Sequence, residues 1–273
     1  MNRQDNAQTA VSIVSATPDD MAELVKLHTA AFRSDLFSNL MLLNRPADTH
    51  QLLMLKSIDH WFGDVNTHLI KAVAADGQMV GWACWALKGV DGYQAGNSDR
   101  GDTSPAANPE ATNPNQEGPV TEDPSEMAAA VRGKRPETSS GGRVLSGQSM
   151  TQDPARRLGG LMREETVRRE HEYLDGKKYV ALQALATDPS RRGCGIGSRL
   201  IQWVVDKADV NGLPCWAHAS PAGNSLYARA GFQQLDKTDF NLAEWAPGGR
   251  EGNRGWGTYT FRYMLRPAKA LVI

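Results

Sequence analysis

The stretch that decides the fold is residues 179–205, YVALQALATDPSRRGCGIGSRLIQWVV. Its first part, 179–186, is an apolar run in which only Gln183 is polar, and Asp188-Pro189 ends it. Such a run predicts a strand that is buried on both faces. After the glycines, apolar residues recur at the spacing of a helix, at Leu200, Ile201, Val204 and Val205. The predicted order is therefore a strand, a glycine-rich turn and a helix.

The glycine turn, residues 192–198, has glycine at 193, 195 and 197. Its backbone N–H groups, from Gly193 to Ser198, lie at the start of a helix and can surround an anion that no Cβ keeps away. Two other phosphate-binding motifs do not fit. No lysine follows the glycines as in a P-loop, and Ser198 stands where a Rossmann fingerprint needs glycine. The turn therefore predicts a pyrophosphate site made by the main chain.

The rest of the chain outside 91–148 alternates strand and helix signals, which predicts a single α/β domain. The expected strands are 11–15, 68–74, 79–87, 213–220 and 255–265, with a further strand after Gly231-Phe232. One expected helix follows Thr17-Pro18-Asp19-Asp20, and others cover 47–62, 154–174 and 222–229. In strand 79–87 we expect a shared face of alternate residues, made by Val80, Trp82, Cys84 and Ala86.

Residues 91–148 differ in composition from the rest of the chain. They are rich in glycine, proline, serine, asparagine and acidic residues and poor in branched aliphatics. Ordering a backbone costs about 1 to 2 kcal/mol per residue, and this segment has too little apolar surface to offset that cost. We therefore expect a disordered insertion within one domain that spans 1–273.

The overall composition of the 273-residue chain limits the classes of partner and the cellular compartment that we expect. Thirty basic and thirty-one acidic residues give a net charge of -1, which argues against nucleic acid or an anionic membrane as a partner. Its 3 cysteines and 6 histidines show no metal-ligand spacing, so we expect no metal. No stretch approaches the roughly 18 apolar residues of a membrane span, and the N-terminus lacks the apolar core of a signal peptide. We expect a cytoplasmic monomer or homodimer.

Three short motifs occur together and in order around the glycine turn. Arg192-Gly193-Cys194-Gly195-Ile196-Gly197 satisfies the pattern Q/R-x-x-G-x-G/A, and Leu185-Ala186-Thr187-Asp188-Pro189 precedes it as the end of a strand. Leu226-Tyr227-Ala228-Arg229-Ala230-Gly231-Phe232 follows as LY-x-x-x-GF. In this order the chain from Val11 onward, apart from the insertion, resembles the Gcn5-related N-acetyltransferase (GNAT) superfamily. Its phrasing between 182 and 232 is similar to fungal small-molecule members.

The resemblance implies a mixed, mostly antiparallel sheet, splayed at its centre with helices on both faces, and acetyl-CoA as co-substrate. The pyrophosphate would bind the N–H groups of Gly193, Cys194, Gly195, Ile196, Gly197 and Ser198. The pantetheine arm would pair with the main chain of Leu185, Ala186 and Thr187, with an N–H near Ala186 as the oxyanion donor. Ser220 and Asn224 are further candidates for pantetheine contacts. Arg192 is either a phosphate ligand or a solvated side chain, and Cys194 is either a small spacer or a reactive thiol.

The resemblance also assigns proton-transfer roles. Tyr227 is implied as the general acid, because a phenol with a pKa of about 10 is protonated at neutral pH and can protonate the coenzyme A thiolate; the alternative is that its ring only packs. Gln183 stands on the central strand where some members carry a glutamate, and it cannot act as a base. His218 is therefore the candidate base, unless it is purely structural. The other candidates are a chain of waters, Glu172 and His171.

The function implied is direct transfer of an acetyl group from acetyl-CoA to the amine of a small molecule, without an acyl-enzyme. We expect residues 32–45 and 241–254 to form the acceptor pocket, the second of them as a moving lid. Two alternatives are O-acetyl transfer to a hydroxylated metabolite and a coenzyme A-binding module without catalysis.

Overall fold

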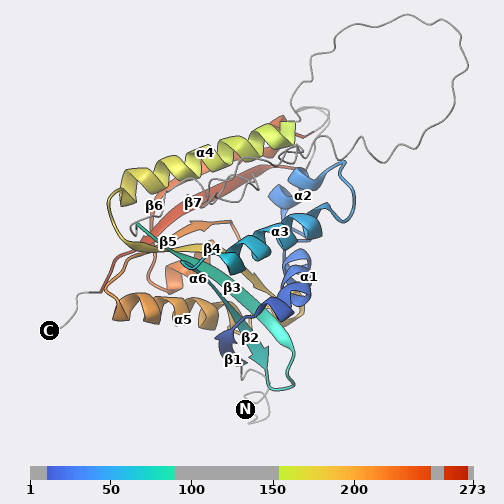
Figure 1. Ribbon diagram of the computed structural model, residues 1–273. Helices are drawn as coiled ribbons and strands as arrows, with labels where there is room; N and C mark the ends of the chain where they lie inside the picture. Colours follow the sequence, from blue (N-terminus) through green and yellow to red (C-terminus); the bar gives the residue numbers. More distant parts are fainter. Residues whose placement is uncertain (1–10, 90–153, 247–254, 270–273) are drawn as a thin grey trace, which may run out of the picture. The chain divides into compact units, whose positions relative to one another are not determined.

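The computed structural model describes residues 11–89, 154–246 and 255–269 (Figure 1). In these residues the chain forms a 7-stranded sheet with the order β1-β2-β3-β4-β5-β7-β6. β4 and β5 run parallel, whereas the other neighbouring strands are antiparallel. The prediction of a mixed, mostly antiparallel sheet in an α/β fold is confirmed.

The strands lie close to the predicted ranges. They are β1 Val11–Ser15, β2 Thr67–Ala74, β3 Met79–Lys88, β4 Tyr179–Thr187, β5 Cys215–Ala219, β6 Gln233–Asn241 and β7 Thr258–Arg266. The helices are α1 Met21–Ala31, α2 Leu36–Leu42, α3 Thr49–Gly63, α4 Pro154–Leu174, α5 Ile196–Val210 and α6 Asn224–Arg229. Single 3-10 turns cover Pro18–Asp20, Pro189–Arg191 and Leu242–Glu244.

Helix α2 was not predicted, because we expected 32–45 to be a connection that lines a pocket. Asp35 is the N-cap residue of this helix, and its carboxylate accepts a hydrogen bond from the Ser38 amide at 2.8 Å. This capping pattern is a sequence signal for a helix start. Phe37 and Leu40 of α2 are buried with Leu158 of α4, so the segment is part of the core.

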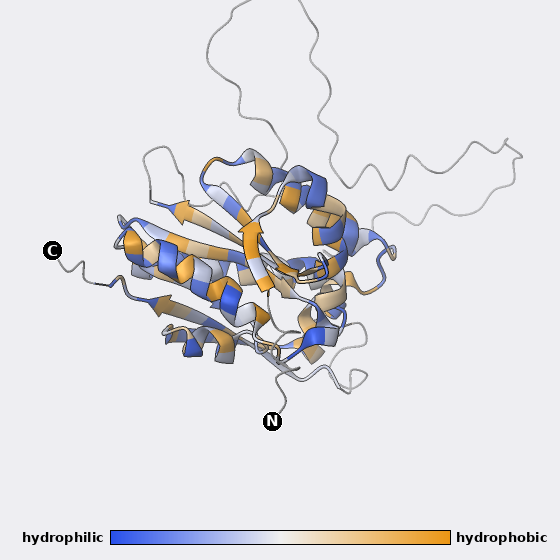
Figure 2. Ribbon diagram, turned by 90° about the horizontal axis from the view of Figure 1, so that it is seen from below, coloured by the Kyte–Doolittle hydropathy of each residue, from blue (hydrophilic) through white to orange (hydrophobic). Residues whose placement is uncertain are grey.

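Helices cover both faces of the sheet. On one face, Leu200, Ile201 and Val204 of α5 join the largest buried cluster. On the other face α1 and α3 pack over β2, β3 and β4, and Tyr173 of α4 lies beside Trp216 of β5. Figure 1 shows α4 and α5 on opposite sides of the sheet. In Figure 2 the helices alternate hydrophilic and hydrophobic residues, as expected of helices with one buried side.

The expected shared face of strand 79–87 is wrong at Val80. Val80 is buried in the cluster under α5, whereas Trp82 and Cys84 are buried in the cluster under α1 and α3. The cause is a register shift: Ala72 pairs with Gly81 but Val73 pairs with Met79, which leaves Val80 as an extra residue. Such a bulge interrupts the alternation of side chains between the two faces.

Several expectations fall on residues outside the described ranges. The insertion 91–148 lies within residues 90–153, and part of the expected lid lies within 247–254, so both stay predictions. Among the described residues, no helix is long and apolar enough to cross a membrane. The same part of the chain holds no group of three or more histidine, cysteine, aspartate or glutamate residues that could bind a metal ion.

A pair of histidines joins α1 to α3. His28 Nδ1 lies 3.1 Å from His50 Nε2, and the His28 ring stacks on Phe32 at 4.3 Å between centroids. Burial, together with the nearby His50, lowers the pKa of His28 from 6.5 to about 3. Because the unfolded chain binds the proton more tightly, acid favours unfolding between pH 6.5 and pH 3.

We predict that His28→Gln makes the stability less sensitive to pH. One histidine with these pKa values costs about 2 kcal/mol of unfolding free energy between pH 7 and pH 5, and glutamine does not titrate. Urea denaturation at both pH values measures the difference, which includes any change at the neighbouring His50. An equal loss of stability in both proteins would contradict the assignment.

Candidate active site

The centre of the candidate site is an extra residue in β4. Cys84 of β3 pairs with Ala184, but Trp85 pairs with Leu182, so Gln183 has no partner in this ladder. The side chains show the same shift. Leu182 and Leu185 are three residues apart and would lie on opposite faces of a regular strand, yet both pack against the α5 cluster. Gln183 is therefore a β-bulge, and the faces of β4 exchange at this residue.

The pairing of β4 with β5 ends at the bulge. The two strands pair over Val180 to Leu182 and Cys215 to Ala217. The remaining residues of β4 keep β3 as a partner and have no pairing with β5. The sheet is therefore splayed at its centre, as predicted, with an unpaired edge on each side of the opening.

The bulge also decides which amides face this opening. The Val180 N–H donates to Pro214 O on the β5 side, and the Asp188 N–H donates to Val80 O on the β3 side, both at 2.9 Å. Alternation from Asp188 directs Ala186 toward β3 and Leu185 and Thr187 toward the opening. Of the three residues expected to bind the pantetheine arm, Leu185 and Thr187 thus direct their N–H groups toward the opening, and Ala186 directs its N–H toward β3.

The glycine turn leaves the strand and enters α5 through left-handed backbone conformations. Gly193 has a φ of 83° and Gly195, the N-cap residue, a φ of 75°. A Cβ at either position would meet no atom within 4 Å, so the turn is open on the side to which these Cβ atoms would point. Gly197 differs, since its Cβ would come 3.2 Å from Leu226. A side chain at Gly197 would therefore need Leu226 of α6 to move by a few tenths of an ångström.

The first turn of α5 presents free amides. No described residue accepts a hydrogen bond from the N–H groups of Gly193, Gly195, Ile196, Gly197 or Ser198. Cys194 is an exception to the prediction, because its N–H donates to Arg191 O at 3.3 Å while its side chain is exposed. The Ile196 side chain is buried, so this residue offers only its main chain. These amides and the positive end of the helix dipole suit an anion.

The two arginines of the turn differ in their surroundings. Arg191 donates to Gln78 Oε1 at 2.7 Å and lies 3.5 Å from Asp76, so it ties the turn to the β2–β3 hairpin. Arg192 is exposed beside the open side of the turn. Of the two, Arg192 is the one available to an anion.

Tyr227 lies on α6, below the same opening. The Ser220 carbonyl accepts the amides of Gly223 and Asn224, which begins this short helix at the end of β5. Tyr227 is 9% exposed, its ring lies 5.6 Å from that of Phe232, and its burial raises its pKa from 10.0 to about 12. It belongs to the cluster under α5, on the face of the glycine turn. Tyr227, Ser220 and Asn224 thus lie on one short helix and the turn that begins it.

His218 lies on the opposite face of the opening. It follows Ala217, the last residue of β5 that pairs with β4. Its ring lies parallel to Tyr263, with centroids 5.2 Å apart, and 4.3 Å from Phe261. Its Nδ1 lies 3.5 Å from Thr166 Oγ1 of α4, and its Nε2 is buried without a partner among the described residues. Burial lowers the pKa of His218 to about 4, so the imidazole is neutral at pH 7.

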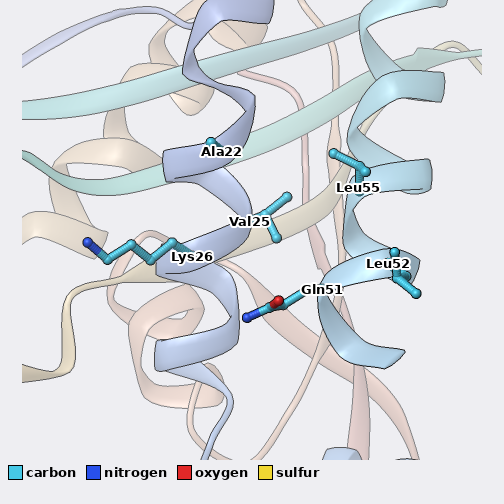
Figure 3. A pocket seen from close by; sticks show the side chains of 6 residues that line it. All are labelled: Ala22, Val25, Lys26, Gln51, Leu52 and Leu55. Carbon is cyan, nitrogen blue, oxygen red and sulfur yellow. The ribbon is translucent and has the colours of Figure 1, made fainter. Parts of the chain in front are cut away.

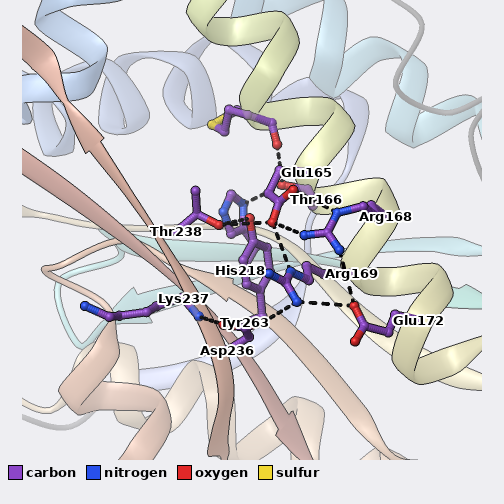
Figure 4. A network of polar contacts seen from close by, with 11 residues as sticks. Glu165, Thr166, Arg168, Arg169, Glu172, His218, Asp236, Lys237, Thr238 and Tyr263 are labelled. Atoms are coloured by element: carbon purple, nitrogen blue, oxygen red, sulfur yellow. Dashed lines mark hydrogen bonds and ion pairs between the residues drawn. The ribbon is translucent and has the colours of Figure 1, made fainter. Parts of the chain in front are cut away.

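A charged network on α4 lies behind His218 (Figure 4). Glu165 pairs with Arg168 and Arg169, and Arg169 also contacts Asp236 of β6. Glu172 pairs with both arginines, and His171 is exposed beside Asp175. The two alternative bases on α4 are therefore engaged elsewhere.

A hydrogen bond between Tyr259 and Asp35 near the opening was not predicted. The Tyr259 hydroxyl of β7 donates to Asp35 Oδ2 at 2.6 Å and also interacts with the Ser220 side chain. The pKa of Tyr259 is raised by burial and by the hydrogen bond to Asp35. The only sequence signal for this bridge was the capping pattern at Asp35. It joins α2 to the end of β5 and builds one wall on the His218 side.

The groove between α1 and α3 has a volume of about 310 Å³ and is not the predicted acceptor site. Figure 3 shows the six side chains that line it, with Val25 of α1 and Leu55 of α3 pointing toward one another. The six are Ala22, Val25, Lys26, Gln51, Leu52 and Leu55. None of them belongs to the glycine turn, β4 or β5, and Lys26 is the one titratable side chain among the six.

Comparison with known proteins agrees with this geometry. Residues 161–234 match the model of the acetyltransferase (GNAT) domain, a range that contains β4, the glycine turn, α5 and α6. No curated protein matches the sequence significantly.

Two solved structures share the fold. A Corynebacterium glutamicum protein, described as histone acetyltransferase HPA2 and related acetyltransferase, has a TM-score of 0.52 at 17% identity over 97% of this chain and 99% of that chain. Arylalkylamine N-acetyltransferase 2 from Aedes aegypti has a TM-score of 0.55 at 15% identity, over 95% and 99%. The chain therefore has the GNAT fold and carries an acetyltransferase domain match, while the likeness to fungal members stays a prediction.

Proposed function

We propose that the protein transfers an acetyl group from acetyl-CoA directly to the amine of a small molecule. The observation that carries the proposal is the opening between β4 and β5. Free backbone amides lie there in two groups, one in the glycine turn and one at the end of β4. Those of the glycine turn suit the pyrophosphate, and those of Leu185 and Thr187 suit the pantetheine amides and the thioester carbonyl. Arg192 adds a positive charge at the open side of the turn.

Direct transfer is favoured by the state of the cysteines. Burial raises the pKa of Cys215 to about 12 and raises the pKa of Cys84, so neither thiol ionises readily. Cys194 is exposed on the turn and has no histidine, aspartate or glutamate partner among the described residues. A cysteine acyl-enzyme needs an activated thiolate. The acetyl group therefore passes straight from coenzyme A to the acceptor.

Tyr227 is the proposed general acid. With a pKa of about 12 it keeps its proton throughout the neutral range. A thiol has a pKa of about 8.5, so full transfer to the leaving thiolate is uphill by about 5 kcal/mol. A turnover of about 10 per second corresponds to a barrier of about 16 kcal/mol, which accommodates this step. Tyr227 thus donates a hydrogen bond to sulfur first and the proton as the carbon–sulfur bond breaks.

His218 is the proposed base, and the two faces of the sheet separate the two substrates. Tyr227 and the glycine turn lie on the α5 face, whereas His218 lies on the α4 face. An acceptor that enters from the α4 side meets a neutral imidazole and aromatic side chains, including Phe261 and Tyr259. An amine of small size, with an apolar group, suits this wall.

We predict that Gly195→Ala weakens acetyl-CoA binding at least tenfold, because the new Cβ would occupy the open side of the turn. Gly176→Ala is the matched control, since Gly176 has a φ of 68°, open surroundings and a place in the turn between α4 and β4. Left-handed alanine costs about 1 kcal/mol at each position. Calorimetry with acetyl-CoA and urea denaturation separate the two effects. Equal affinities in both variants would contradict the anion site.

We predict that amines, rather than alcohols, support release of coenzyme A. The expected rate rises with pH as the amine loses its proton, since only the neutral amine attacks a thioester. A screen of amines, amino acids and hydroxylated metabolites, with free thiol as the readout, measures this. Thiol release with hydroxylated compounds alone would favour O-acetyl transfer, and no release with any acceptor would favour a binding module.

We predict that Tyr227→Phe lowers kcat at least tenfold and leaves the affinity for acetyl-CoA nearly unchanged, because the ring still packs but no proton is available to sulfur. Tyr173→Phe on α4 controls for loss of a tyrosine hydroxyl away from the opening. Stopped-flow detection of thiol and calorimetry give the two quantities. Unchanged turnover in the Tyr227 variant would remove the general acid role.

A further inference from the structure

Thr166 of α4 makes a contact that fixes the proton position on His218. The Thr166 hydroxyl donates to Met162 O, one helical turn earlier, at 2.8 Å. A hydroxyl carries a single proton, so toward any other group its oxygen can only accept. His218 Nδ1 lies 3.5 Å from that oxygen, and this contact is a hydrogen bond only when Nδ1 carries the hydrogen.

The other ring nitrogen is then a free acceptor. With hydrogen on Nδ1, the neutral imidazole holds its lone pair on Nε2. This Nε2 is buried and has no hydrogen-bond partner among the described residues. Leaving a buried acceptor unpaired is unfavourable, and a ligand that donates an N–H would offset that cost.

The ring is held in this orientation by its neighbours. Tyr263 lies parallel to it at an interplanar angle of 6°, and Phe261 lies on β7 as well, with its centroid 4.3 Å away. The Tyr263 hydroxyl also interacts with Thr166 and lies 3.3 Å from Thr238 Oγ1. Stacking thus fixes the orientation of the imidazole ring, and the contact with Thr166 selects its tautomer.

The charged groups near His218 have partners of their own. On α4, Glu165 pairs with Arg168 and Arg169, and Arg169 reaches Asp236 on β6. Glu165 also accepts from Thr238, and Tyr263 is the titratable group of β7 that faces the ring. Because no carboxylate among the described residues bonds to the imidazole, its tautomer depends on Thr166.

We propose that Thr166 is a positioning residue that holds His218 in the Nδ1–H tautomer, so that Nε2 accepts the N–H of the acceptor amine. This inference rests on the proposed acetyl transfer. As the nitrogen–carbon bond forms, Nε2 takes one proton from nitrogen. As the carbon–sulfur bond breaks, sulfur takes the proton of Tyr227. Solvent then carries the proton of His218 back to Tyr227, which restores both groups.

The test compares Thr166→Val, which keeps the shape of the side chain, with Thr166→Ser, which keeps the hydroxyl. Thr29→Val is the matched control, because Thr29 makes the same bond to Val25 O within α1 at 2.9 Å. Long-range ¹⁵N NMR at pH 7 reports the His218 tautomer, and His218→Gln assigns the signals. Steady-state kinetics give kcat and KM, and urea denaturation shows that each variant is folded.

We expect the wild type, Thr166→Ser and Thr29→Val to show Nδ1–H, and Thr166→Val to populate Nε2–H and lose at least tenfold in kcat with an unchanged KM for acetyl-CoA. An Nε2–H tautomer in the wild type, or unchanged tautomer and kcat in Thr166→Val, would overturn this inference. Absence of acetyl transfer by the wild type would instead overturn the proposed function. The NMR measurement needs no turnover, so the two failures are distinguishable.

Discussion

The structure of the site depends on one extra residue in the central strand. Gln183 interrupts the ladder between β3 and β4, and beyond it β4 no longer pairs with β5. Two edges of a sheet are then left with unpaired amides and carbonyls inside the fold, which is costly unless a ligand or water binds there. A chain-like ligand with amide groups can add to such an edge as a further strand would. The bulge therefore creates both the space and the hydrogen-bonding groups of the candidate site.

The two faces of the sheet divide the chemistry between them. On the α5 face, the helix dipole and the free amides of the glycine turn favour negative charge, and buried Tyr227 keeps its proton. On the α4 face, stacking holds neutral His218 next to the opening. Burial raises the pKa of a phenol and lowers the pKa of an imidazole, and both shifts favour the uncharged form. An acid and a base are thus kept apart, on either side of one gap.

Much of this arrangement could be predicted from local sequence, and the rest depended on tertiary contacts. Glycine spacing at 193–197 identified the turn, and apolar periodicity identified α5. The polar Gln183 in an apolar run was noticed, yet nothing local showed that it is a bulge or that it reverses which amides face the gap. The Asp35 capping pattern was available and would have revealed α2. The contact of Thr166 with His218 joins residues 52 positions apart and requires the packed fold.

The most direct test of the account is a crystal structure of the protein with acetyl-CoA, in which the position of the pyrophosphate is measured. With acetyl-CoA bound as proposed, the pyrophosphate oxygens are expected within about 3.2 Å of at least two amides among Gly195, Ile196, Gly197 and Ser198, and the thioester between β4 and β5. A pyrophosphate bound elsewhere, with these amides facing solvent, would contradict the account.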